Sequence, residues 1–133
     1  MLRSPFFYLI ITLFLFSCNE KKHIYLNKEP IQKEALKLRD TAYENFIKQN
    51  LNKAYYQFNE SKALYETLKD SANISYILLQ MASIQQMNGD YYGSKETMTE
   101  ALPYAIKNRK YTAAINIRLG IADKELSLYD DAI

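Results

Sequence analysis

The side chains that most often carry out catalysis are scarce in this chain of 133 residues. It has one cysteine, Cys18, and one histidine, His23. Nucleophilic catalysis needs a nucleophile beside a base that a third group orients, and no such set can be assembled here. No second histidine, cysteine or acidic cluster stands at ligand spacing from His23, and the sequence has no Gly-rich phosphate loop. We therefore expect a protein that is not an enzyme and that uses neither a metal nor another cofactor.

Cys18 has a different chemistry open to it. It follows an apolar run from Phe6 to Phe16, which has the length of a signal-peptide core and is too short for a membrane span of roughly 20 residues. The segment LFSC that ends at Cys18 resembles the lipobox of bacterial lipoproteins, as found in Bacteroidetes. The resemblance implies removal of residues 1–17 and attachment of acyl chains such as palmitate to Cys18, with the protein held on a membrane in the cell envelope, on the periplasmic or outer-membrane side. The alternatives are an uncleaved signal anchor or an incidental cysteine.

The composition of the rest of the chain favours helices. The chain has only 3 Gly and 3 Pro, and Ala, Leu, Lys, Glu and Gln are frequent. No alternating β-branched run of strand length follows residue 30. The 17 Lys and Arg and the 15 Asp and Glu are interspersed, with no basic stripe that would bind nucleic acid. The sequence predicts an all-α domain over residues 31–133, preceded by a lipidated tether over 18–30.

A repeat is visible in three stretches, 41–54, 81–94 and 119–132. In each stretch a small residue is followed 12 positions later by a second small residue: Ala42 and Ala54, Ala82 and Ser94, Gly120 and Ala132. The first small residues are 40 and then 38 positions apart. Pairs of antiparallel helices suit this pattern, because small residues allow two backbones to approach closely.

We expect five whole helices, at about 31–48, 51–69, 72–88, 91–108 and 110–126. The third should bury one stripe, formed by Ile74, Ile77, Leu78, Met81 and Ala82. Pro103 should bend the fourth. A sixth helix should begin near residue 129, where Asp130 and Asp131 would complement its positive end. Because the sequence stops there, we interpret it as the N-terminal part of a longer protein. Most of the 12 tyrosines are expected in the core, with Tyr43 and Tyr76 as exceptions.

These residues resemble the tetratricopeptide repeat. The second unit has Gly89-Asp90-Tyr91 at its turn, and the third has Leu119-Gly120, whereas the first has Ser61 where alanine is usual. The resemblance implies an α-solenoid of antiparallel helix pairs, with about two and a half repeats of 38–40 residues instead of the standard 34.

The same resemblance implies a groove, lined by the first helix of each pair, that binds an extended peptide. The matching positions are Arg39, Tyr43, Phe46, Tyr76, Leu79, Ser83, Gln86 and Lys124, together with Leu36, Ile117 and Ile121. The alternative is that these residues are ordinary surface residues or pack between repeats.

The predicted function is that of a membrane-tethered scaffold that binds a protein or peptide. One alternative is the sensory input region of a membrane signalling or transcriptional regulator, whose C-terminal module would lie beyond Ile133. A glycan-capturing outer-membrane lipoprotein is a third possibility, but it would need a longer chain with loop insertions. Reading the gene beyond Ile133 would distinguish the first two.

Overall fold

The computed structural model describes residues 27–130, with the side chain of Tyr129 left out. This part of the chain forms five α-helices and no strand: α2 (Lys28–Ile47), α3 (Leu51–Leu68), α4 (Ser71–Met87), α5 (Tyr91–Ala105) and α6 (Arg109–Asp130). The predicted all-α class is confirmed. The expected signal peptide, the lipid site at Cys18, and His23 lie outside the described residues.

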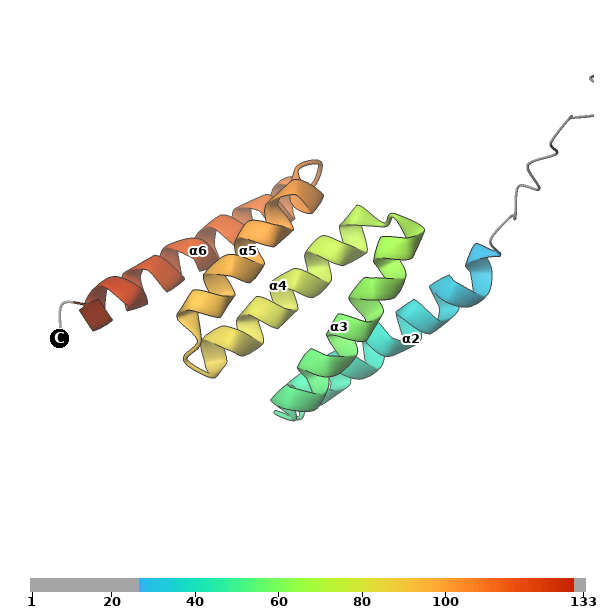
Figure 1. Ribbon diagram of the computed structural model, residues 1–133, viewed down its shortest axis with the longest axis horizontal. Helices are drawn as coiled ribbons and strands as arrows, with labels where there is room; N and C mark the ends of the chain where they lie inside the picture. The colour runs from blue at the N-terminus through green and yellow to red at the C-terminus, as the bar shows by residue number, and fades with distance from the viewer. Residues whose placement is uncertain (1–26, 131–133) are drawn as a thin grey trace, which may run out of the picture.

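The helices stand in a row of antiparallel hairpins (Figure 1). Each helix packs against the next one in the chain, and α4 also contacts α6. The first hairpin is α2 with α3 and the second is α4 with α5, so that α6 occupies the place of a third first helix. Packing of this kind is consistent with a solenoid-like arrangement, in which each unit contacts mainly its neighbours.

A left-handed residue follows each of the helices α2, α3 and α4. Gly89, expected from the sequence to end a helix, has φ 77° after α4, and Gln49 takes the same conformation (φ 61°) after α2. Asp90 then caps α5, because its carboxylate accepts a hydrogen bond of 2.9 Å from the N–H of Gly93. Local sequence therefore fixes where these helices end and begin.

The predicted core positions are buried. The expected stripe of α4 lies inside, and Ala42, Ala54, Ala82 and Ser94 are fully inaccessible, as their role at a close helix approach requires. The burial of α4 extends beyond one stripe, because α3, α5 and α6 pack around it. Four further residues of α4 are therefore buried: Ser75, Leu79, Ser83 and Ile84.

Two predicted helix boundaries are wrong for reasons of capping. Residues 28–30 of the expected tether belong to α2, because the Asn27 side chain accepts a hydrogen bond of 3.2 Å from the N–H of Glu29. Pro30 fits the first helical turn, where an N–H would lack a helical partner in any case. The fourth helix runs through Pro103 but ends at Ala105. Asn108 then caps α6, accepting from the N–H of Tyr111 at 3.2 Å.

The predicted turn before residue 129 is also wrong. α6 continues to Asp130 as one helix, and no sixth helix begins within the described residues. Unlike the segments after α2, α3 and α4, which contain Gln49, Lys69 and Gly89, this segment has no left-handed residue up to Asp130. Asp130 is therefore the last described residue of α6 and not the first turn of a new helix. Gly120 is exposed, with no atom within 4 Å of the position that its Cβ would take, so it mediates no close approach here.

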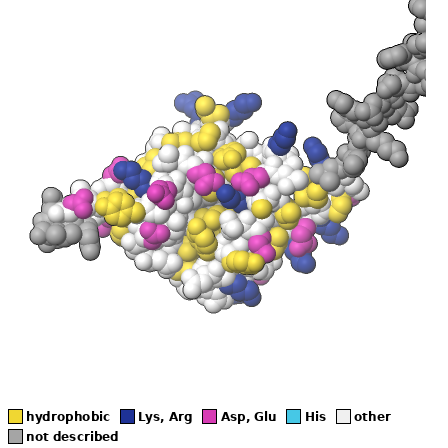
Figure 2. All heavy atoms as spheres, in the orientation of Figure 1, with side chains coloured by type: hydrophobic (Ala, Val, Ile, Leu, Met, Phe, Trp, Pro, Cys, Tyr) yellow, Lys and Arg dark blue, Asp and Glu magenta, His cyan; other side chains and the backbone are white. Residues whose placement is uncertain are grey.

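The expectation that tyrosines pack in the core holds only in part. Among the tyrosines whose side chains are described, only Tyr65 is buried. Four others are half-buried against the core, namely Tyr55, Tyr76, Tyr104 and Tyr111, so Tyr76 is not the exception that was expected. On the face seen in Figure 2, acidic, basic and apolar side chains are intermixed. No helix among residues 27–130 is long and apolar enough to cross a membrane.

Candidate functional site

Three helices meet at a cleft of about 450 Å³, which we call the tyrosine cleft. It is lined by Arg39, Asp40, Tyr43 and Glu44 of α2, Asn73 and Tyr76 of α4, and Tyr111 of α6. The first helix of each hairpin and α6 thus each contribute one tyrosine. The cleft is the place where α2, α4 and α6 come together, as the repeat interpretation requires of a groove lined by first helices.

Arg39 forms hydrogen bonds with residues of two helices that line the cleft. Its Nη1 donates to Oδ1 of Asn73 at 2.7 Å, which joins α2 to α4. Nε and Nη2 both donate to Oδ1 of Asp40, at 3.1 and 2.8 Å. Burial alone would lower the pKa of Arg39, but the hydrogen bond and charge of Asp40 raise it. The guanidinium of Arg39 therefore stays charged and is held in place where it lines the cleft.

The aromatic rings of the cleft are close to one another. The ring centroids of Tyr76 and Tyr111 are 6.3 Å apart, which joins α4 to α6. The guanidinium carbon of Arg39 lies 5.9 Å from the centroid of Tyr76, within cation–π range. Burial, and secondarily the neighbouring Tyr43, raise the pKa of Tyr76, so its phenol keeps its proton in the neutral pH range.

The structure brings three of the predicted groove residues together, namely Arg39, Tyr43 and Tyr76. Phe46 lies beside them, with its ring centroid 6.3 Å from that of Tyr43. Leu79 is not available to a ligand, because α4 is packed on that side and leaves it 9% exposed.

Ser83 and Gln86, two further predicted contacts, are occupied by interactions within the protein. Ser83 is buried, and its hydroxyl donates to the carbonyl of Leu79 at 2.7 Å. Gln86 exchanges hydrogen bonds with Arg118 of α6, donating from Nε2 to its carbonyl at 3.1 Å and accepting from its Nη1 at 3.2 Å. The pair therefore links α4 to α6.

The remaining groove positions lie outside the cleft. Leu36 is exposed on α2, and Ile117, Ile121 and Lys124 are exposed on α6, but none of the four lines the tyrosine cleft. The prediction that they contact a ligand has no support from this geometry.

Sequence reasoning missed Asn73 and Tyr111, which complete the cleft. The residues that meet between first helices are 34 positions apart for Arg39 and Asn73 and 32 for Gln86 and Arg118. These separations are shorter than the repeat period of 38–40 residues, so aligning the repeats does not place these residues opposite one another. Neighbouring helices in a stack cross at an angle, so equivalent positions do not lie opposite one another. Asn73 and Tyr111 each lie in the first turn of their helix. A polar residue and a tyrosine at these positions were the only features of the sequence that could have indicated their place in the cleft.

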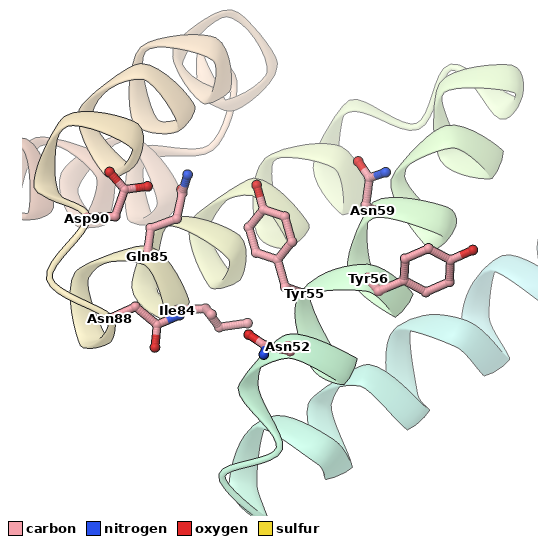
Figure 3. A pocket seen from close by; sticks show the side chains of 8 residues that line it. All are labelled: Asn52, Tyr55, Tyr56, Asn59, Ile84, Gln85, Asn88 and Asp90. Atoms are coloured by element: carbon pink, nitrogen blue, oxygen red, sulfur yellow. The ribbon is translucent and has the colours of Figure 1, made fainter.

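A second cleft of about 450 Å³ opens between the two hairpins (Figure 3). It is lined by Asn52, Tyr55, Tyr56, Asn59, Ile84, Gln85, Asn88 and Asp90, and it shares no residue with the tyrosine cleft. In Figure 3 the ring of Tyr55 lies between α3 and α4, whereas Tyr56 points away from α4. Burial, and then the charge of Asp90, raise the pKa of Tyr55.

Within residues 27–130 no group of three or more histidine, cysteine, aspartate or glutamate side chains could hold a metal ion. The tyrosine cleft offers ring faces, phenol hydroxyls and one fixed guanidinium, which are typical of recognition surfaces.

Comparisons with protein-family profiles, with curated protein sequences and with solved structures find no match to this chain.

Proposed function

We propose that this chain is a membrane-tethered scaffold that binds an extended segment of another protein in the tyrosine cleft. One observation carries the proposal: α2, α4 and α6 each contribute a tyrosine to a single cleft. Tyrosine is enriched at protein interfaces, because its ring buries a large area at low conformational cost and its hydroxyl can form hydrogen bonds. The fold by itself would be only an associational argument for binding.

The hydrogen bonds of Arg39 preorganise the cleft for a ligand. Because its guanidinium is fixed by Asp40 and Asn73, it loses little freedom when a ligand arrives. The phenol hydroxyls of Tyr43, Tyr76 and Tyr111 form no hydrogen bond with any other residue in 27–130. They remain free to bond a peptide backbone.

The resemblance to tetratricopeptide repeats and the lipobox resemblance at Cys18 are part of the same proposal. The small-residue pairs buried inside the hairpins support the first. The short apolar run before Cys18 supports the second. Two or more acyl chains would hold the protein on a membrane, because each buried CH₂ contributes about 0.8 kcal/mol. The scaffold would then present the tyrosine cleft near a membrane surface.

Selection from a random peptide library tests peptide binding. The full-length chain in detergent micelles is used as bait, and selected peptides are measured by fluorescence anisotropy against wild type, Tyr76→Ala and Tyr56→Ala. Tyr56 is the matched control, because it is 63% exposed and lies in the second cleft. We expect Tyr76→Ala to weaken binding by about tenfold or more, as loss of a central interface aromatic does, and Tyr56→Ala to leave it unchanged. Selected peptides that bind all three proteins equally would overturn the assignment of the site.

A further inference from the structure

The polar groups of the tyrosine cleft include both donors and acceptors. Its donors are the phenol hydroxyls and the remaining N–H groups of Arg39, and its most open acceptor is the carboxylate of Glu44. Its amide and carboxylate acceptors are partly used: Oδ1 of Asn73 and Oδ1 of Asp40 already accept from Arg39. A ligand that offers carbonyl acceptors to the phenols and Arg39, and a basic group to Glu44, matches this set.

A proline-rich segment is such a ligand. Proline has no backbone N–H, and a polyproline II helix forms no internal hydrogen bonds, so its carbonyl oxygens are free to accept. A strand-like peptide, by contrast, brings an N–H donor at every residue, and two acceptor atoms of the cleft, Oδ1 of Asn73 and Oδ1 of Asp40, already accept from Arg39. Pyrrolidine rings also pack against aromatic faces, which is how aromatic-lined grooves recognise polyproline helices.

The charge of the cleft adds a second requirement. Its lining contains one cation, Arg39, and two carboxylates, Asp40 and Glu44. Arg39 and Asp40 form an ion pair at 2.8 Å, whereas Glu44 is exposed and its nearest ion-pair partner, Lys48, is 4.0 Å away. The carboxylate of Glu44 is therefore the group most open to a charged ligand, and it favours a basic one.

Resting on the proposed peptide site, we infer that the ligand of the tyrosine cleft is a proline-rich segment in the polyproline II conformation, with an arginine or lysine next to Glu44. The Arg39–Asn73 hydrogen bond joins α2 to α4 at the cleft and the Tyr76–Tyr111 ring pair joins α4 to α6, so one extended segment can contact all three helices.

The test uses three dye-labelled decapeptides and the full-length chain in detergent micelles. The first peptide has nine prolines and one arginine, the second has glycine and serine in place of the prolines, and the third has glutamate in place of the arginine. We expect the first to bind at least about tenfold more tightly than the second, because the polyproline helix is already ordered before it binds. We expect it to bind about two- to fivefold more tightly than the third, which is the usual size of an exposed charge effect.

Variants show where the peptide binds, and they separate the preference for proline from the preference for arginine. Glu44→Gln should remove the preference for arginine over glutamate while the preference for proline over glycine and serine remains. Tyr76→Phe keeps the ring and removes one donor, so it should weaken binding less than Tyr76→Ala. Tyr56→Ala in the second cleft should bind as wild type does. Circular dichroism on each variant reports whether it is folded, and Glu44→Gln, at an exposed site, keeps the test valid if Tyr76→Ala does not fold.

The outcomes distinguish this inference from the proposed function. If library peptides without prolines bind through Tyr76 and the polyproline peptide does not, the inference is wrong and peptide binding stands. If neither library nor polyproline peptides bind, both are wrong. Equal binding of the proline and the glycine–serine peptides, or an unchanged arginine preference in Glu44→Gln, would also overturn the inference.

Discussion

Two buried serines should respond in opposite directions to the same substitution. Ser61 on α3 and Ser94 on α5 are both fully inaccessible. The hydroxyl of Ser61 donates to the carbonyl of Ala35 at 2.8 Å and so joins α3 to α2. The hydroxyl of Ser94 has no hydrogen-bond partner among the described residues. We predict that Ser61→Ala destabilises the fold and that Ser94→Ala stabilises it.

The magnitudes follow from the two environments. Loss of the Ser61 bond should lower the free energy of unfolding by about 0.5–1.5 kcal/mol, whereas removal of an unsatisfied buried hydroxyl at Ser94 should raise it by about 1–3 kcal/mol. Alanine also has the higher helix propensity, by a few tenths of a kcal/mol, but this gain is common to both variants and cancels in their difference. The two variants should therefore differ by about 1.5 kcal/mol or more.

Thermal unfolding followed by far-UV circular dichroism measures this difference. For a domain of this size, 1.5 kcal/mol corresponds to roughly 6–12 °C in Tm, with Ser94→Ala above wild type and Ser61→Ala below it. The repeat supplies an internal precedent, because alanine occupies the equivalent places at Ala101 and Ala54, 40 residues away in each case. If both variants shift Tm in the same direction by the same amount, the difference in hydrogen bonding between the two sites has no energetic consequence and the reasoning is refuted.

Three further changes have expected outcomes. Ala82→Leu should lower the unfolding free energy by about 1–3 kcal/mol, because the site is fully packed; the same change at exposed Ala63 is the control, and equal melts would mean that the predicted close approach is absent. Although burial alone would lower the pKa of Lys62, the hydrogen bond and charge of Glu100 at 2.8 Å, with Glu66, raise it above its ordinary value. A raised pKa means that the folded state holds the proton more tightly. The contribution of Lys62, on the order of 1 kcal/mol, should therefore be constant below the ordinary lysine pKa and decline as pH rises through the higher folded value. Melts of wild type and Lys62→Met should converge in alkaline buffer, and a gap that widens there would contradict the sign. Cys18→Ala should abolish incorporation of a palmitate analogue in cells, and equal labelling of variant and wild type would exclude the lipid anchor.

Local features of the sequence predicted most of the fold. Periodic apolar residues predicted the buried stripe of α4, because an amphipathic stripe follows a repeat of 3.6 residues that needs no knowledge of the partner helix. Gly89 likewise predicted the turn after α4 from local sequence alone. The end of α6 could not be predicted by analogy, because the similarity of residues 119–132 to the other repeats does not extend to a residue that stops a helix.

The candidate site was only partly predictable, because it depends on how helices cross. Arg39, Tyr43 and Tyr76 were found from their places in the repeat. Tyr111 was missed, because the stagger between α4 and α6 sets its position and no local pattern encodes that stagger. Ser83 was assigned to the groove because its position in the repeat says nothing of the neighbouring helix that covers it.

The row of hairpins has a mechanical consequence. Because contacts run mainly from each helix to its neighbour, tension applied at Asn27 and Asp130 would pass through the helix interfaces in series, without a central core that must fail all at once. The hairpin of α2 and α3 could be peeled from the rest while α5 and α6 remained paired. Arg39 bridges α2 to α4 across that point of separation, so the first peeling step would also open the tyrosine cleft. Stretching this molecule would therefore disassemble the proposed binding site before most of its helices had unfolded.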